Sequence, residues 1–321
     1  MATSFDPSFG TATQALAAMR DGAISSRELT AHVFDRIGRY DPALHAFVTL
    51  REDAALAEAA RADAARADAA RARGEPLGAL HGLPVLVKDV FATAATRTTA
   101  GSASLAGYVP TEDAAAVARL VGAGAIVVGK TNVPEFAGDW QAFNDVAGTT
   151  SNPWDATRTS GGSTGGGAAA LAAGLGFLEL GGDLAGSLRI PAHCCGVYGH
   201  RPSAGLVPTR GHIPPPPGVP DVPNELSAAG PLARDANDLR LALAVLGGPD
   251  TPDALAYRWT MPAPRRARLA DYRVGYVLDD PFCPVDASVQ TALASAVDAL
   301  RRSGVRLTEG WPDGVAPSRQ Y

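Results

Sequence analysis

The sequence predicts an α/β fold in which helices cover a parallel or mixed β-sheet. Two observations support this prediction. Helical patterns alternate with short apolar stretches typical of buried strands, which is the order expected of βαβ units. The apolar share of 46% and the charged share of 19% are those of a soluble globular protein, and 321 residues can bury a large core.

The first quarter of the chain is predicted to be mainly helical. The expected elements are, in order, helices over 12–21 and 26–39, a strand over 46–50 and a long helix over 51–73. Ser25 and Glu28 predict a capping box at the start of the second helix. The long helix contains ARADAARADAARAR, whose alanines and Asp/Arg pairs are typical of a solvated surface helix. We expect residues 1–75 to form a helical layer packed on the core, which residues 76–321 form. Together they are expected to make a single domain.

The core is predicted from the same alternation. The expected elements are, in order, a strand over 83–91, a helix over 111–125, strand 126–128, helix 235–246, strand 272–277, helix 285–303 and strand 305–307. Residues 139–160 are polar and are expected to be irregular. The Pro-rich stretch 208–224 is expected to be a surface loop over a site or an edge.

Charge and composition exclude several classes of function. The net charge is -5 and no stretch is strongly basic, which argues against nucleic acid and anionic membranes as main partners. The N-terminus does not resemble a secretory signal, and the longest apolar run, Ala168 to Leu178, is too short to span a bilayer. We therefore expect a cytoplasmic protein in which this run forms a buried helix. The cysteines and histidines lack metal-ligand spacing, so no metal is expected.

Two serines in glycine-rich turns, Ser163 and Ser187, bracket a small-residue apolar segment. Such turns bring backbone N–H groups close to a ligand, and a serine there is well placed to react. The segment contains no histidine or lysine that could act as its base. Only two of the 28 basic residues in the chain are lysines, Lys88 and Lys130, and a buried lysine, unlike an arginine, can become a neutral base.

Two motif matches are rejected. Residues 124–131 match the Walker A pattern, but their middle residues AIVV are strand-like, and Pro134 lies where the following helix should already run. Residues 161–165 match a nucleophile elbow, but the preceding ATRTS is not an apolar strand and no histidine follows His212. A histidine-based triad is therefore not expected.

A lysine-based serine hydrolase is the remaining arrangement. Lys88 lies near the end of an apolar strand, where loss of water lowers the pKa of a lysine and leaves a base near neutral pH. A serine between this lysine and the nucleophile would relay the proton. The SxxK pattern is absent, because Val85 and Val127 stand three residues before the two lysines. The residues alone leave open that Lys88 only caps the end of a strand.

Residues 80–250 strongly resemble the amidase signature family. The segments that carry the resemblance are GLPVLVKDVF (82–91), GAIVVGKTNVPEF (124–136), SNPWDATRTSGGSTGGGAAALAAG (151–174), GGDLAGSLRIPAHCCGVYGHRPSAGLVP (181–208) and GPLARDANDLRLALAVLGGPD (230–250). The resemblance implies the family's fold, a mixed β-sheet core covered by helices on both faces. It also implies a further C-terminal portion, which we expect this chain to lack, so the single domain is expected to be truncated at its C-terminal end.

The resemblance further implies a Ser-cis-Ser-Lys triad that cleaves amides. Lys88 matches the lysine of the VKD motif and is implied as the base. Ser163 matches the bridging serine, which in the family follows a cis peptide bond, here after Gly162. Ser187 matches the nucleophile.

The loop that leads to Ser187 is implied as the oxyanion hole. Its expected donors, all backbone N–H groups, are Leu184, Ala185, Gly186 and Ser187. Asp183 and Arg189 are expected to brace this loop as structural support. Ala185 stands where the family has glycine, and if that position needs a positive φ, its methyl group costs roughly 1 kcal/mol. Thr164 replaces the family's usual second serine and keeps the hydroxyl group.

The implied activity is hydrolysis of a carboxylic amide to an acid plus ammonia or an amine, through an acyl-enzyme on Ser187 with Lys88 as base via Ser163. The expected substrate is a small-molecule amide, and no cofactor is required. A homodimer stays open. Two other functions also stay open: an amidotransferase subunit that delivers ammonia in a tRNA-dependent complex, and a truncated, inactive relative.

Overall fold

The computed structural model describes residues 5–72, 77–213, 225–251 and 253–315. Contacts divide the chain into two compact units, Met1–Thr260 and Met261–Tyr321. The helices expected as a layer packed on the core, over residues 1–75, belong to the same unit as the main sheet. Most of the Pro-rich stretch, residues 214–224, lies outside the described residues.

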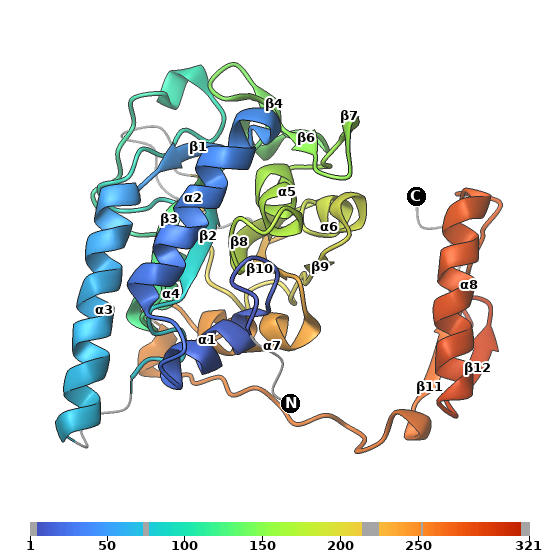
Figure 1. Ribbon diagram of the computed structural model, residues 1–321. Helices are drawn as coiled ribbons and strands as arrows, with labels where there is room; N and C mark the ends of the chain where they lie inside the picture. The colour runs from blue at the N-terminus through green and yellow to red at the C-terminus, as the bar shows by residue number, and fades with distance from the viewer. Residues whose placement is uncertain (1–4, 73–76, 214–224, 252, 316–321) are drawn as a thin grey trace. The chain divides into compact units, whose positions relative to one another are not determined.

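The first unit is built on a six-stranded sheet with the order β1-β3-β2-β8-β10-β9 (Figure 1). Its strands are β1 (Phe47–Leu50), β2 (Pro84–Lys88), β3 (Ile126–Thr131), β8 (Leu178–Asp183), β9 (Tyr198–Gly199) and β10 (Ala228–Ala233). Strand β2 runs parallel to β3 and β8, whereas the other pairs are antiparallel. Every residue of β2, β3, β8 and β10 is buried, as expected of strands covered on both faces. The predicted α/β fold with a mixed sheet is confirmed.

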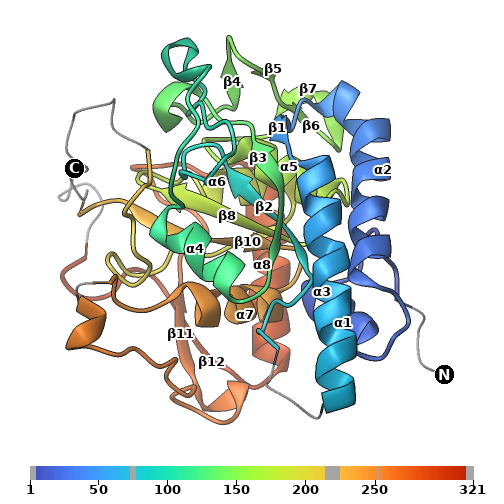
Figure 2. The same cartoon turned by 90° about the vertical axis from the view of Figure 1, so that its left-hand side faces the viewer.

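Helices cover both faces of this sheet (Figure 2). The helices of the first unit are α1 (Ala12–Arg20), α2 (Ser26–Leu44), α3 (Glu52–Ala72), α4 (Ala115–Gly122), α5 (Gly165–Ala172), α6 (Arg189–Cys195) and α7 (Ala236–Leu246). Helix α5 packs on β2 and β8, whereas α4 and α7 contact each other on the opposite side. The predicted capping box is present, because Ser25 and Glu28 each accept a hydrogen bond from the other's backbone N–H.

The apolar run from Ala168 to Leu178 does not form one helix, which corrects the prediction. Helix α5 ends at Ala172, Gly174 turns the chain with a φ of 70°, and Leu178 begins β8. Glycine adopts this left-handed conformation without the steric penalty of a Cβ, so Gly174 ends the helix. Strands β9 and β10 were not predicted, because the AAGPLA of β10 lacks the β-branched and aromatic residues that favour strands.

The remaining elements of the first unit are short. They are η1 (Ala103–Leu105), η2 (Glu135–Ala137), η3 (Asp253–Leu255), β4 (Phe143–Asn144), β5 (Gly148–Thr149), β6 (Ser151–Asn152) and β7 (Asp155–Thr159). Strands β4 and β5 form one antiparallel pair and β6 and β7 another, within the stretch expected to be irregular. The rejected Walker A residues end in strand β3, which confirms that they form no phosphate loop.

The second unit is a small β-α-β arrangement, as predicted. It consists of η4 (Leu269–Asp271), β11 (Arg273–Tyr276), α8 (Ala287–Arg302) and β12 (Arg306–Glu309). The two strands pair in parallel, and Asp286 caps α8 by accepting the backbone N–H of Ser288. Its buried apolar residues are Val297 and Val305.

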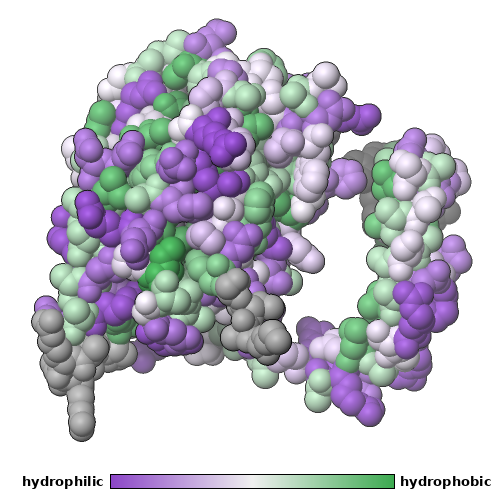
Figure 3. Space-filling model, viewed as in Figure 1, coloured by the Kyte–Doolittle hydropathy of each residue, from purple (hydrophilic) through white to green (hydrophobic). Residues whose placement is uncertain are grey.

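The surface of the first unit is mixed in character. Hydrophilic and hydrophobic residues alternate over the face shown in Figure 3. Within the described ranges, no helix combines the length and the apolar character needed to cross a membrane. The same residues contain no group of three or more His, Cys, Asp or Glu side chains arranged to hold a metal ion.

Candidate active site

Lys88 is the last residue of β2 and is 1% exposed. Its Nζ donates to Ser163 Oγ at 2.6 Å and lies 3.4 Å from the carbonyl oxygen of Gly182. Burial lowers the pKa of Lys88 to about 7, against the opposing effect of the Glu179 and Asp183 carboxyls. A substantial fraction of this lysine is therefore a neutral amine at neutral pH.

Ser163 lies in a tightly packed turn before α5. The peptide bond between Gly162 and Ser163 is cis, and Ser163 is fully buried. A Cβ at Gly162 would lie 2.6 Å from the backbone nitrogen of Gln141, so only glycine fits there. A Cβ at the preceding Gly161 would lie 2.8 Å from Cα of Pro191 in α6. These close approaches fix the turn that carries the Ser163 hydroxyl to Lys88.

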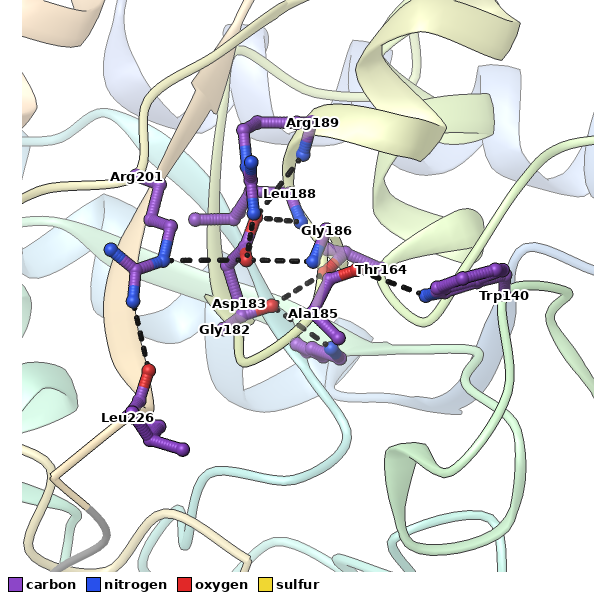
Figure 4. A network of polar contacts seen from close by, with 11 residues as sticks. Trp140, Thr164, Gly182, Asp183, Ala185, Gly186, Leu188, Arg189, Arg201 and Leu226 are labelled. Atoms are coloured by element: carbon purple, nitrogen blue, oxygen red, sulfur yellow. Dashed lines mark hydrogen bonds and ion pairs between the residues drawn. The ribbon is translucent and has the colours of Figure 1, made fainter. Parts of the chain in front are cut away.

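Ser187 lies between β8 and α6 and is 7% exposed. Its backbone carbonyl accepts the N–H of Thr164 at 3.2 Å, which joins the two serine-bearing loops. The Thr164 hydroxyl also donates to the carbonyl of Gly182 at 3.4 Å (Figure 4). The Ser187 hydroxyl forms no hydrogen bond with any described residue, Ser163 included. The structure thus brings Lys88, Ser163 and the Ser187 loop together.

Asp183 organises the loop that precedes Ser187. Its buried carboxylate accepts the backbone N–H groups of Gly186 at 2.9 Å and Leu188 at 3.1 Å. Arg189 donates to it through Nε at 3.1 Å and a terminal nitrogen at 2.9 Å, and Arg201 lies 3.5 Å away (Figure 4). Burial acts to raise the pKa of Asp183, but the hydrogen bonds outweigh it and hold the pKa below its usual value. These contacts are those expected of a carboxylate that braces the loop.

The loop differs from the expected oxyanion hole in one respect. The N–H of Gly186 donates to Asp183 and is not available to an oxyanion, which corrects the expectation of four donors. The N–H groups of Leu184, Ala185 and Ser187 donate to no acceptor among the described residues. Gly186 has a φ of 117°, whereas Ala185 is not among the non-glycine residues with positive φ. The steric cost considered for the Ala185 methyl group therefore does not arise.

A pocket of about 290 Å³ opens at Ser187. Its lining residues are Ala137, Gly138, Asp139, Trp140, Leu184, Ala185 and Ser187. Trp140 is 58% exposed and donates its indole N–H to the carbonyl of Ala185 at 3.1 Å. Sequence reasoning missed residues 137–140, because no spacing ties them to the Ser187 loop. The only feature of the sequence that could have indicated them is an aromatic residue, Trp140, within a polar stretch expected to be irregular.

Lys130, the second lysine, lies on the opposite face of the sheet. Its register partner on β2 is Val87, so its side chain points away from the side that Lys88 occupies. Its Nζ donates to the carbonyl of Phe91 and to the hydroxyls of Thr93 at 2.9 Å and Thr98 at 3.2 Å. Burial lowers the pKa of Lys130 to about 8. Lys130 thus holds the segment after β2 and does not contact either serine.

Known proteins resemble this chain in sequence and in fold. A family model described as Amidase matches residues 28–316. The chain is 38% identical over 288 residues to the glutamyl-tRNA(Gln) amidotransferase A subunit of Thermosynechococcus vestitus, covering 89% of this chain and 57% of that relative. The chain thus spans little more than half the length of this curated relative.

Two solved structures have the same fold. The native peptide amidase of Stenotrophomonas maltophilia superposes with a TM-score of 0.79 at 32% identity, covering 94% of this chain and 61% of that enzyme. A bacterial aryl acylamidase of the amidase signature enzymes superposes with a TM-score of 0.81 at 28% identity, covering 95% and 62%. With the family match extending over most of its length, the chain belongs to the amidase signature family.

Proposed function

We propose that this chain hydrolyses the C–N bond of a carboxylic amide through an acyl-enzyme on Ser187. The observation that carries the proposal is the buried hydrogen bond of 2.6 Å from Lys88 Nζ to Ser163 Oγ. It lies beside a loop whose serine lines an open pocket. Membership of a family of enzymes that act on C–N bonds supports the same reaction class.

The first half-reaction forms the acyl-enzyme. Neutral Lys88 accepts a proton from Ser163, which takes the proton of Ser187 as Oγ attacks the carbonyl carbon. The resulting oxyanion accepts hydrogen bonds from the free N–H groups of Leu184, Ala185 and Ser187. The proton on Lys88 then returns through Ser163 to the leaving nitrogen, and the C–N bond breaks.

The second half-reaction releases the acid. A water molecule gives a proton to the same relay and attacks the ester carbonyl of the acylated Ser187. The tetrahedral oxyanion again lies against the loop N–H groups. Collapse returns the proton to Ser187 Oγ and frees the carboxylic acid, so each cycle consumes one amide and one water.

A fluorophosphonate probe tests the proposal without knowledge of the substrate. The folded chain is expected to gain one probe mass, and Ser187→Ala is expected to gain none. Ser203→Ala, which changes an exposed serine outside the pocket, is the matched control and should label like the unaltered chain. A folded chain that takes up no probe would favour the inactive relative instead. Circular dichroism establishes folding in each case.

An amidotransferase component is the second candidate, and the identity with the A subunit from Thermosynechococcus vestitus favours it. This candidate predicts ammonia release from glutamine and transfer to charged tRNA once partner subunits are added. The first candidate predicts hydrolysis of simple alkyl or aryl amides by the chain alone. If transfer to tRNA were observed, the expectation that the protein has no nucleic-acid partner would be wrong.

A further inference from the structure

A buried glutamate lies on the same face of the sheet as Lys88. Glu179 of β8 is 1% exposed and is in register with Leu86 of β2. Residues two apart on a strand point to the same side, so Leu86, Lys88 and Glu179 share one face. In the sequence Glu179 is a lone acid in an apolar run, with no spacing that connects it to the serines.

The Glu179 side chain crosses β2 beside Lys88. Thr131 on β3 is the register partner of Lys88, and its hydroxyl donates to Glu179 Oε1 at 2.6 Å. Since β2 lies between β3 and β8, a side chain that starts on β8 and reaches Thr131 must pass over β2 where Lys88 stands. Helix α5 closes this space, because a Cβ at Gly167 would lie 2.3 Å from Glu179 Cδ.

Glu179 is a carboxyl near Lys88 that forms no ion pair with any described side chain, although the charge of Lys130 also acts on it. Its Oε2 has no hydrogen-bond partner within the described residues. Asp183, the other carboxyl that acts on Lys88, is held by Arg189 and Arg201. When Lys88 accepts a proton, a buried ammonium forms, and such a charge is costly unless a counter-charge accompanies it.

The other titratable groups around this site do not supply that charge. Lys130 faces the opposite side of the sheet and is itself a cation, which interacts most strongly with Asp89 and less strongly with Glu179. Burial, followed by the charge of Lys88, lowers the pKa of His212 to about 3, so this ring stays neutral. Helix α5, with the sequence GGGAAALA, carries no titratable side chain.

We propose that Glu179 is the counter-ion of Lys88, a positioning residue that stabilises the ammonium formed when Ser187 gives up its proton. The inference rests on the proposed function of Lys88 as the base. Glu179 thereby sets the pH at which the relay becomes active. The electrostatics agree in direction, because burial lowers the pKa of Lys88 while Glu179 raises it. Burial raises the pKa of Glu179 to about 8, whereas the hydrogen bond from Thr131 and the charges of Lys88 and Lys130 lower it, so protonation of Lys88 favours the carboxylate form of Glu179.

The test is the rate of fluorophosphonate labelling measured from acidic to alkaline pH. Ser187 Oγ bonds to phosphorus, fluoride leaves, and Lys88 takes the proton, so the rate reports the base directly. Glu179→Gln keeps the side-chain volume and an acceptor for Thr131 but removes the negative charge. The ammonium of Lys88 then loses its stabilisation, so the pKa of Lys88 falls. The acid limb of the profile of labelling rate against pH is therefore expected to move to lower pH by about one unit. The maximal rate is expected to fall about tenfold, because the transition state keeps an uncompensated charge.

Three comparisons make the result decisive. An acid limb that stays in place or moves to higher pH in Glu179→Gln would overturn the inference. If that variant does not fold, Thr131→Val decides, because it removes only the hydrogen bond to the carboxyl and should shift the limb slightly in the same direction. Glu58→Gln, which changes a carboxyl paired with Arg51, should leave the limb unchanged. A wild-type chain that does not label would count against the proposed function itself.

Discussion

The two lysines occupy neighbouring strands and are both buried, yet their surroundings differ. Lys88 contacts a serine hydroxyl beside a pocket, whereas Lys130 contacts a carbonyl and two threonine hydroxyls in a closed interior. Burial lowers both pKa values, to about 7 and about 8. A lowered pKa therefore does not by itself identify a base. What separates the two is the partner of Nζ: Lys88 binds Ser163, whose neighbour Thr164 is hydrogen-bonded to the pocket-lining Ser187.

The comparison predicts its largest effect for Lys88. Lys88→Met keeps a linear side chain but removes the base, and kcat/KM is expected to fall about a thousandfold. Steady-state hydrolysis of an amide and probe labelling measure this loss, with circular dichroism as the folding control. If Lys130→Met lost as much activity while still folded, the two lysines could not have the different roles proposed for them.

The pH dependence should follow Lys88. Its pKa is lowered in the folded chain to about 7, so the neutral base dominates above that value and the ammonium below it. Activity is therefore expected to fall tenfold per pH unit on the acid side of about pH 7, and to level off above it. A pH–rate profile checks the prediction. An acid limb near pH 4 would point to a carboxyl group as the titrating base.

For Lys130→Met we expect mainly a loss of stability. The substitution leaves the Phe91 carbonyl and the Thr93 and Thr98 hydroxyls without their buried donor, at a cost of about 2 kcal/mol in the free energy of unfolding. Activity per folded molecule should stay within about threefold, since the lysine does not touch the serines. Urea unfolding and labelling of the same sample separate the two quantities. Unchanged stability would show that Lys130 is not a structural anchor.

The smallest effect is expected at Trp140, on the pocket side. Trp140→Phe keeps the aromatic surface and removes the N–H that donates to the Ala185 carbonyl. The neighbouring N–H groups are then held less firmly, so kcat should fall a few-fold, about 1 kcal/mol or less in activation free energy. Substrate kinetics and a thermal melt check this. A melting temperature that falls while kcat is unchanged would assign the hydrogen bond to stability alone.

The sequence predicted the strand that carries Lys88 because an unbroken apolar run is a local signal. It also indicated Ser163 and Ser187, because each lies in a long segment that specifically matches the amidase signature family. Other features depend on pairing between distant residues. The approach of Trp140 to the Ser187 loop, the use of the Gly186 N–H by Asp183 and the passage of Glu179 over β2 all arise from the packing of strands and loops. Local sequence patterns cannot predict these contacts, because they depend on how the folded chain packs.

The glycines that open α5 have a practical consequence for protein engineering. Replacing a helical glycine by alanine commonly stabilises a protein by about 0.5–1 kcal/mol. Gly38 in α2 is a suitable site for that exchange, because no atom lies within 4 Å of the position that a methyl group would take. Gly166 and Gly167 are not, because a methyl group would meet the Asn132 backbone or the Glu179 carboxyl at 2.3 Å. A thermostabilisation library guided by helix propensity should therefore leave α5 unchanged and begin with α2.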